Sequence, residues 1–126
     1  MDLAIRISAM SEANRLKVGA VAVRDNKILS QGYNGTPSGW DNICEDENNK
    51  TKPEVLHAEQ NLICFLAKSN ESSDGAILFV TTLPCENCAK LIIMAGFKTV
   101  YYKELYRSDI GLKMLEKANI EIFKVD

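Results

Sequence analysis

The stretch Ala76–Tyr102, AILFVTTLPCENCAKLIIMAGFKTVYY, contains the pattern that decides the fold. Ala76–Val80 is an apolar run with the length and composition of a buried strand. Cys85–Met94 has helical spacing, and Gly96 is placed to end that helix. Thr99–Tyr102 has the β-branched and aromatic composition of a further strand. A strand, a helix and a strand in this order predict neighbouring parallel strands with a helix packed on them.

The rest of the chain continues this alternation of helices and strands. Apolar residues at helical spacing predict helices over residues 1–12, 56–68 and 108–117, and short apolar runs predict strands over residues 18–23, 28–33 and 120–125. Asp25–Lys27 is a hairpin turn, and the polar residues 41–53 are expected to form an exposed excursion. This order of elements predicts an α/β fold with a mixed or largely parallel sheet, covered by helices on both faces.

Length and composition are typical of a soluble globular protein. The chain has 126 residues, of which 46% are hydrophobic and 25% charged, so we expect residues 1–126 to form a single domain. The net charge of −2 argues against binding to polymeric nucleic acid, because such proteins usually carry a basic surface. The longest apolar run, residues 91–97, is too short to cross a membrane, and no secretory signal is visible. We therefore expect a cytoplasmic protein, in the host cytoplasm if it is viral.

One histidine and two cysteines form a predicted zinc site. His57 is the only histidine of the chain, and Cys85 and Cys88 form a Cys-x-x-Cys pair at the start of a predicted helix. An imidazole and two thiolates are ligands that tetrahedral Zn²⁺ accepts while its fourth position stays open to water. Residues two apart on a helix point about 200° apart. His57 and Glu59 can therefore serve one site only if the metal lies beyond the N-terminal end of their helix.

Glu59 is the predicted acid–base group of this site. A carboxylate this near the histidine can move the proton of a zinc-activated water, whose pKa is typically about 7, without binding the metal. That role requires a raised carboxyl pKa, for which a closed and partly apolar pocket is the simplest cause. The pattern His-x-Glu followed by Pro-Cys-x-x-Cys, here His57–Glu59 and Pro84–Cys88, is the signature of zinc-dependent nucleobase deaminases.

Other interpretations of the same cysteines stay open at the level of the sequence. Cys44 could serve as a fourth ligand and close the site, which would make the zinc structural. A Cys-x-x-Cys pair also occurs in thioredoxin-like redox proteins, but the tryptophan typical of those motifs is missing here, because Trp40 lies elsewhere in the chain. Cys64 is expected to pack on the core face of its helix. Glu59 has no purpose in a structural site and therefore favours the catalytic interpretation.

The chain resembles the deoxycytidylate (dCMP) deaminases from about residue 18 to residue 125. The two zinc motifs are shared by several deaminase branches, whereas Gly32–Gly39, GYNGTPSG, behind Val18–Val21 is similar to the dCMP branch in particular. Transfer-RNA adenosine deaminases have a related but different loop there, and small cytidine deaminases usually have a cysteine in place of His57. The resemblance implies a three-layer α/β/α cytidine-deaminase-like fold with a mixed five-stranded sheet.

The resemblance also implies a reaction and its groups. The reaction is the zinc-dependent hydrolysis of dCMP to dUMP and ammonia, which supplies dUMP for thymidylate synthesis. One Zn²⁺ per chain would be held by His57, Cys85 and Cys88, with Glu59 as proton shuttle. No second zinc is expected, because the chain has no second histidine. The alternatives are deamination of dCTP, cytidine or adenosine in transfer RNA, and a non-catalytic zinc-stabilised binding module.

Substrate contacts follow from the same resemblance. Asn34 would contact the deoxyribose hydroxyl, since an amide both donates and accepts hydrogen bonds, although an asparagine there also tolerates a left-handed turn before Gly35. The expected pocket walls are Val18, Ala20 and Ala58, with the backbone of Thr82–Leu83 accepting a hydrogen bond from the substrate amino group. Arg107 with Tyr106 is the first choice for the 5′-phosphate, because guanidinium binds phosphate with two hydrogen bonds. The other candidate cations are Arg15, Lys17 and Arg24.

The predicted partners are small molecules and further copies of the chain. Family members are usually homo-oligomers, often hexamers, and the apolar residues of the helices over 56–68 and 85–94 are consistent with such association. Regulation by dCTP and dTTP is common in the family and is associated with the loop over Gly32–Gly35. We expect neither a membrane nor a nucleic-acid polymer as partner.

Overall fold

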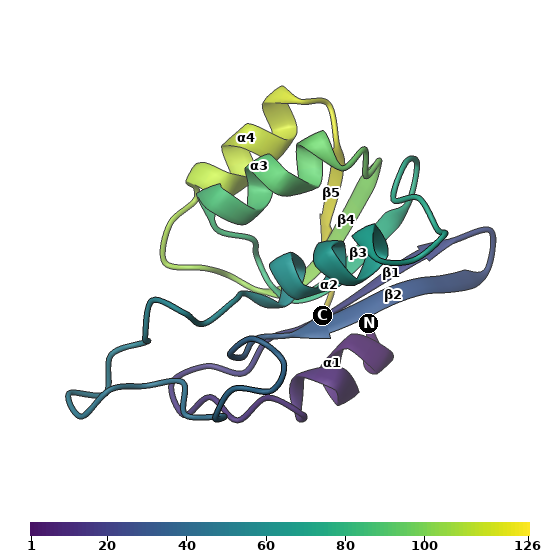
Figure 1. The fold of residues 1–126 in the computed structure, drawn as a ribbon. Coiled ribbons are helices and arrows are strands. Elements are labelled where there is room, and N and C mark those ends of the chain that lie inside the picture. Colours follow the sequence, from purple (N-terminus) through teal and green to yellow (C-terminus); the bar gives the residue numbers. More distant parts are fainter.

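The computed structural model describes all residues, 1–126, and arranges them around one mixed sheet (Figure 1). The elements in chain order are α1 (Asp2–Ser8), β1 (Gly19–Arg24), β2 (Lys27–Tyr33), α2 (Ala58–Ala67), β3 (Ile77–Thr82), α3 (Glu86–Met94), β4 (Thr99–Glu104), α4 (Ile110–Lys117) and β5 (Glu121–Lys124). The strands lie in the order β2-β1-β3-β4-β5. β1 is antiparallel to both of its neighbours, whereas β3, β4 and β5 are parallel. The predicted fold class and order of elements are confirmed.

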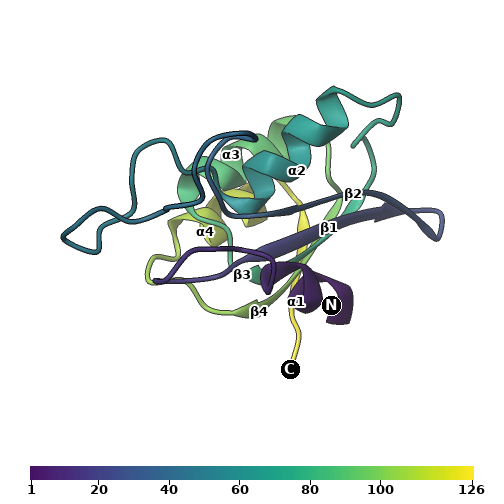
Figure 2. The same cartoon turned by 60° about the horizontal axis from the view of Figure 1, so that its bottom comes forward.

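Helices cover both faces of the sheet, as Figures 1 and 2 show. α2, α3 and α4 pack on one face, and α1 packs on the other. The main core lies beneath the three helices, where Leu62, Ile92 and Leu115 are fully buried against the inward side chains of the strands. A smaller cluster holds α1 against the opposite face through Ala4, Ile7 and Val21. None of the four helices is long and apolar enough to span a membrane.

The outward residues of the parallel strands form a stack of aromatic rings beside α1. Phe79 and Tyr101 are neighbours in the pairing of β3 with β4, and their ring centroids lie 4.9 Å apart. Tyr101 stacks in turn on Phe123 of β5, at 5.3 Å. Because cross-strand aromatic pairs stabilise a sheet, this row contributes to the stability of the three parallel strands.

The segment between β2 and α2 differs from the prediction. Residues 41–53 were expected to be exposed, but Cys44 and Glu45 are only 2% and 7% exposed. The segment folds back on itself through a bridge between Glu45 and Thr51 and a hydrogen bond from the Lys52 N–H to the Cys44 carbonyl. Most polar residues of this segment face solvent, whereas Cys44 and Glu45 face the rest of the protein.

The prediction for Cys64 is also wrong, because this residue is exposed. The buried face of α2 consists of Ala58, Glu59, Leu62 and Leu66. Cys64 follows Leu62 by two positions, which turns its side chain about 200° away from that face. The helix therefore presents a polarisable thiol to solvent rather than to the core.

Candidate active site

The three predicted zinc donors come together where two helices begin. His57 is the N-cap of α2, and Cys85 is the N-cap of α3. Nδ1 of His57 lies 3.4 Å from Sγ of Cys85 and 3.3 Å from Sγ of Cys88. The donor atoms of the three residues all lie within 4.8 Å of one another. The sequence predicted this arrangement, in which the candidate metal site lies at the N-terminal ends of both helices.

The donor set fits a tetrahedral zinc ion. Zn–S and Zn–N bonds of about 2.3 and 2.0 Å at tetrahedral angles place nitrogen and sulfur about 3.5 Å apart. The observed separations of 3.3 and 3.4 Å are slightly shorter, so a small outward movement of the side chains accommodates the ion. Cys44 does not belong to this group of donors, and its thiol lies 3.7 Å from the Asn42 carbonyl instead. The set therefore has three protein ligands, and the alternative of a site closed by Cys44 is not supported.

The local backbone holds the donors in place. Oε1 of Gln60 accepts a hydrogen bond from the backbone N–H of His57 at 2.7 Å, which fixes the start of α2. The carbonyl of Cys85 accepts the first hydrogen bond within α3, from Ala89 at 2.8 Å. Pro84, which has its side chain fully buried, sets the direction in which the chain enters that helix. The ligands are thus carried by rigid backbone rather than by free loops.

The electrostatics of the three donor side chains favour a thiolate at Cys85. The hydrogen bond from the Cys88 thiol, followed by that from His57, lowers the pKa of Cys85 to about 3. The same hydrogen bond to Cys85, together with burial, raises the pKa of Cys88. The hydrogen bond to Cys85 also raises the pKa of His57. A metal that binds both sulfurs as thiolates must displace the proton of Cys88, so metal binding releases protons.

Glu59 lies in the first turn of α2 and is only 4% exposed. Burial raises the pKa of its carboxyl group to about 7, against the opposing effect of its backbone hydrogen bond. A carboxyl group with a pKa near neutrality can both accept and return a proton. This is the raised pKa that the sequence led us to expect, and its cause is the expected one.

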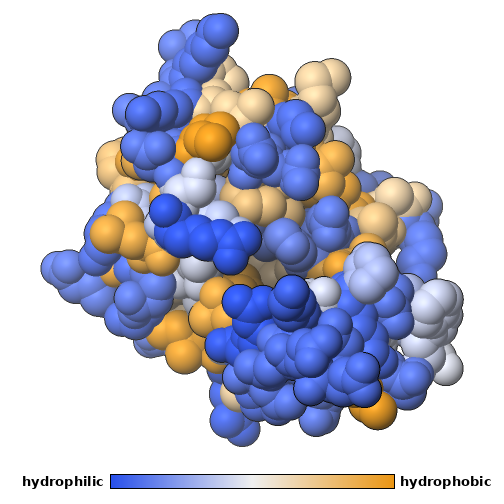
Figure 3. Space-filling view, turned by 90° about the vertical axis from the view of Figure 1, so that its left-hand side faces the viewer, coloured by the Kyte–Doolittle hydropathy of each residue, from blue (hydrophilic) through white to orange (hydrophobic).

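His57, Glu59 and Cys85 line a cavity of about 320 Å³, whereas Cys88 is buried and does not line it. Figure 3 shows the corresponding side of the molecule, with a hollow near its centre that is bordered by both hydrophilic and hydrophobic residues. The cavity is lined by Ala13, Arg15, Leu16, Val18, Asn34, Cys44, Glu45, Thr51, Val55, His57, Ala58, Glu59, Thr82, Leu83, Cys85, Tyr106 and Arg107. Its volume is in the range usual for small-molecule sites, and it combines apolar walls with a few converging polar groups.

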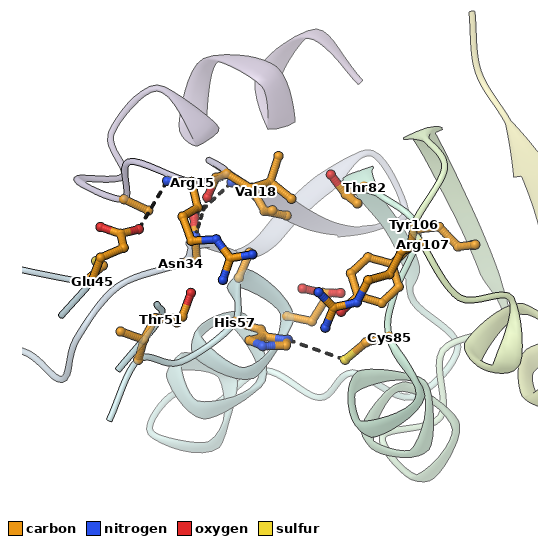
Figure 4. A pocket seen from close by; sticks show the side chains of 17 residues that line it. Arg15, Val18, Asn34, Glu45, Thr51, His57, Thr82, Cys85, Tyr106 and Arg107 are labelled. Carbon is orange, nitrogen blue, oxygen red and sulfur yellow. Dashed lines mark hydrogen bonds between the residues drawn. The ribbon is translucent and has the colours of Figure 1, made fainter. Parts of the chain in front are cut away.

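Two arginines reach this cavity from opposite sides (Figure 4). Arg15 comes from the segment between α1 and β1, and Arg107 comes from the segment between β4 and α4. The guanidinium carbon of Arg107 lies 5.3 Å from the ring centroid of Tyr106, so the two side chains stack. Two cations in a half-apolar cavity create a site for an anionic group.

Three other predicted contacts lie outside the cavity. Lys17 is exposed and does not line it, and Ala20 is fully buried under the helices. Arg24 lies at the far end of β1, where it donates to the carbonyls of Ser72 and Asp74. Val18 precedes β1 and lies at the rim of the cavity. Ala20 lies within β1, whose first four residues are buried, and it therefore belongs to the core.

Asn34 lines the cavity and also ties its wall together. Its Oδ1 accepts a hydrogen bond from the Val18 N–H at 2.9 Å, and its Nδ2 donates one to the Leu16 carbonyl at 2.7 Å. Asn34 does not have a positive φ, so the alternative of a left-handed turn is wrong. A carboxamide has two donor hydrogens and two acceptor lone pairs, which leaves one of each for a ligand.

Sequence reasoning missed Glu45, which is buried in the cavity wall. One oxygen of its carboxylate accepts hydrogen bonds from two successive backbone N–H groups, those of Asn14 at 3.0 Å and Arg15 at 3.2 Å. The carboxylate thereby holds the segment that carries Arg15. Only one signal was present in the sequence, namely an acidic residue directly after the apolar pair Ile43–Cys44.

Removal of this carboxylate should destabilise the protein. We expect Glu45→Ala to lower the free energy of unfolding by about 2 kcal/mol, because it leaves two N–H groups without an acceptor. Glu45→Gln should have a smaller effect, since the amide oxygen still accepts. Urea denaturation measures both, with Glu47→Ala, an exposed neighbour, as the control. Equal effects of Glu45→Ala and Glu47→Ala would contradict the assigned role.

Comparison with known proteins agrees with this geometry. The model of the cytidine and deoxycytidylate deaminase zinc-binding region matches residues 1–104, which include all three donors and Glu59. The chain belongs to the cytidine and deoxycytidylate deaminase family. The predicted family and the zinc cofactor are thereby confirmed, and the site described above is the zinc-binding region of a deaminase.

Several known proteins are similar to the chain over most of its length. It is 37% identical to ComE operon protein 2 of Bacillus subtilis over 125 residues, which cover 95% of the chain and 66% of that protein. It is 30% identical to the deoxycytidylate deaminase of Enterobacteria phage T4, with 99% of the chain and 87% of that protein covered. The crystal structure of dCMP deaminase from the cyanophage S-TIM5, in complex with dCMP and dUMP, has a TM-score of 0.96 and 46% identity. That match covers 98% of this chain and 92% of the cyanophage chain.

Proposed function

We propose that this deaminase converts dCMP to dUMP with release of ammonia, and that Glu59 is its proton shuttle. The observation that carries the proposal is the convergence of a buried carboxyl group, a three-donor zinc site and two arginines on one cavity. The cyanophage relative, which was crystallised with dCMP and dUMP, supports this choice of substrate.

The residues of the site have different roles in the reaction. Zn²⁺, when bound by His57, Cys85 and Cys88, supplies an activated water. Glu59 accepts a proton from the water that adds to C4 of the cytosine ring, and it passes protons to ring N3 and then to the amino nitrogen. The water oxygen becomes the new carbonyl oxygen, and the two hydrogens of the water end on N3 and on the departing ammonia. The burial of Glu59 makes both directions of proton transfer accessible near neutral pH.

The remaining lining residues orient the nucleotide. Ala58 and the backbone of Thr82–Leu83 flank the base, and the free hydrogen-bonding positions of Asn34 contact the deoxyribose hydroxyl. Arg107 and Arg15 bind the 5′-phosphate, with Tyr106 as an additional donor. Guanidinium groups suit this role because they bind phosphate with two parallel hydrogen bonds.

A panel of substrates tests the proposed function. Release of ammonia is measured from dCMP, deoxycytidine, dCTP, cytidine and an adenosine-containing transfer RNA, at equal concentrations. We expect dCMP to have the highest kcat/KM. Activity on cytidine or transfer RNA without activity on dCMP would refute the choice of substrate, and activity on none of them would favour a zinc-stabilised binding module.

Loss of a phosphate-binding cation should affect the nucleotide but not the nucleoside. We expect Arg107→Ala to raise KM for dCMP about 10- to 100-fold, because charge-assisted hydrogen bonds contribute about 1.5–3 kcal/mol. Arg15→Ala should act in the same direction, and kcat/KM for deoxycytidine should stay unchanged in both variants. Lys17→Ala, which removes an exposed cation outside the cavity, is the matched control. An equal loss for dCMP and deoxycytidine would show that these arginines do not bind phosphate.

We further propose that the protein associates with copies of itself and responds to nucleotides. A homo-oligomer, with a hexamer favoured, is supported by exposed apolar residues on α2 and α3, among them Phe65 at 41% and Met94 at 85% exposure. The cytoplasmic location and the effects of dCTP and dTTP stay predictions. Sedimentation analysis with and without these two nucleotides tests both the size of the assembly and its response.

A further inference from the structure

We propose that Gly32 and Gly111 are positioning residues for the zinc donors. Each of the two helix starts that carry donors is met by a glycine from a neighbouring element, with no side chain between the two backbones. Gly32 of β2 lies against the start of α2, and Gly111 of α4 lies against the turn that leads into α3. Because glycine has no side chain, β2 approaches α2 closely and α4 approaches the start of α3 closely. These contacts fix the positions of His57 and Cys85.

Gly111 makes the more direct contact. A Cβ atom on this residue would lie 2.3 Å from the carbonyl oxygen of Pro84 and 3.0 Å from the carbonyl carbon and oxygen of Cys85. All three are backbone atoms of Pro84 and Cys85, in the turn that carries the zinc donor Cys85. Real Cβ atoms essentially never approach closer than 3.0 Å, so this turn or α4 would have to move by more than half an ångström.

Gly32 makes the equivalent contact at the other donor helix. A Cβ atom there would lie 2.4 Å from the carbonyl oxygen of Ala58 and 2.7 Å from the backbone nitrogen of Leu62. Ala58 directly follows His57, so a displacement of the first turn of α2 moves the histidine with it. Glu59 is carried on the same turn.

These displacements are large compared with what a zinc site tolerates. Metal–ligand distances in proteins stay within about 0.2 Å of their usual values. A shift of more than half an ångström at one donor therefore exceeds the tolerance, whereas the donors on the other helix stay where they are. The expected consequence is weaker zinc binding by a protein that still folds.

One substitution at three glycines tests this inference. Gly32→Ala and Gly111→Ala disturb the donor helices, and Gly19→Ala is the matched control. A Cβ atom on Gly19 would lie 2.1 Å from the Ala4 carbonyl oxygen and 2.5 Å from the Ser8 nitrogen. This overlap is equally severe, but it falls on α1, which carries no donor. Zinc dissociation constants are measured by competition with a chelator, and the absorption spectrum of the Co²⁺-substituted protein reports the ligand geometry.

We expect the zinc dissociation constants of Gly32→Ala and Gly111→Ala to rise about 10- to 100-fold, as is typical when the residues that orient metal ligands are changed. Their Co²⁺ spectra should also differ from that of the wild-type protein. Gly19→Ala should lower the melting temperature but change the zinc dissociation constant by no more than about twofold, because it shares no contacts with the donors. If a variant folds only when zinc is present, its affinity is compared with that of the wild-type protein through the zinc concentration at which half of the variant is folded.

Several results would overturn the inference. Wild-type zinc affinity in both donor-helix variants would do so, as would an equal loss in Gly19→Ala. Failure of both donor-helix variants to fold at any zinc concentration, while Gly19→Ala folds, would assign the two glycines a purely structural role. A wild-type protein that binds no zinc would refute the zinc site itself, before any variant is compared.

Discussion

Glu59→Gln is expected to lower kcat for dCMP by about 10²- to 10⁴-fold, which is the usual contribution of a general acid–base group. Glutamine has nearly the shape of glutamate but does not exchange protons near neutral pH. It therefore preserves the packing of this buried position while it removes the group that accepts and returns the proton. Stopped-flow or steady-state release of ammonia measures kcat, and elemental analysis measures the zinc content, which should stay at one per chain.

The appropriate control is Glu86→Gln, which makes the same chemical change one residue after Cys85. Glu86 is exposed and does not line the cavity, so its loss changes the net charge near the metal without touching the substrate. We expect its kcat to stay close to the wild-type value. A Glu59→Gln enzyme with more than a tenth of wild-type kcat would mean that another group moves the proton.

Cys88→Ala is expected to abolish both zinc binding and turnover. Cys88 is fully buried and supplies one of three donors, so its removal leaves an imidazole and a single thiolate for the metal. The zinc dissociation constant should rise by more than about 100-fold, which exceeds the usual effect of changing a residue that only orients a ligand. Chelator competition gives the dissociation constant, and ammonia release gives the activity.

Two further cysteines provide controls for this experiment. Cys64→Ala removes an exposed thiol on α2, and Cys44→Ala removes a buried thiol of the cavity wall that is not among the donors. Both variants should keep one zinc per chain. Loss of zinc from Cys44→Ala would restore the interpretation of a closed, four-ligand structural site, and it would remove the open position on which catalysis depends.

The zinc site could be predicted because its information is local in the sequence. His57 and Glu59 are two residues apart, and Cys85 and Cys88 are three apart, so each pair lies at the start of one predicted helix. Because a zinc ion needs more ligands than either pair supplies, the two pairs are expected to share one site. The order of strands and helices was predictable for a similar reason, since each element carries its own periodicity of apolar residues.

The cavity wall could not be predicted in the same way. Glu45 is buried because it binds backbone groups 30 and 31 positions earlier in the chain, and no local pattern encodes such a contact. Asn34 was expected to face the substrate, but its amide also joins the Leu16–Val18 segment to the loop after β2. Lys17 and Arg15 look alike in the sequence, and only the path of the folded chain decides which of them enters the cavity.

The donors on α2 and α3 come from segments 28 positions apart in the chain. An ion held by both helices therefore acts as a cross-link that exists only while the protein is folded. Free zinc at 100 times its dissociation constant would add about 2.7 kcal/mol to the free energy of unfolding. Resistance of this protein to proteolysis is thus tied to the supply of zinc around it, and a chain made under zinc starvation is at a disadvantage even before its catalytic defect matters.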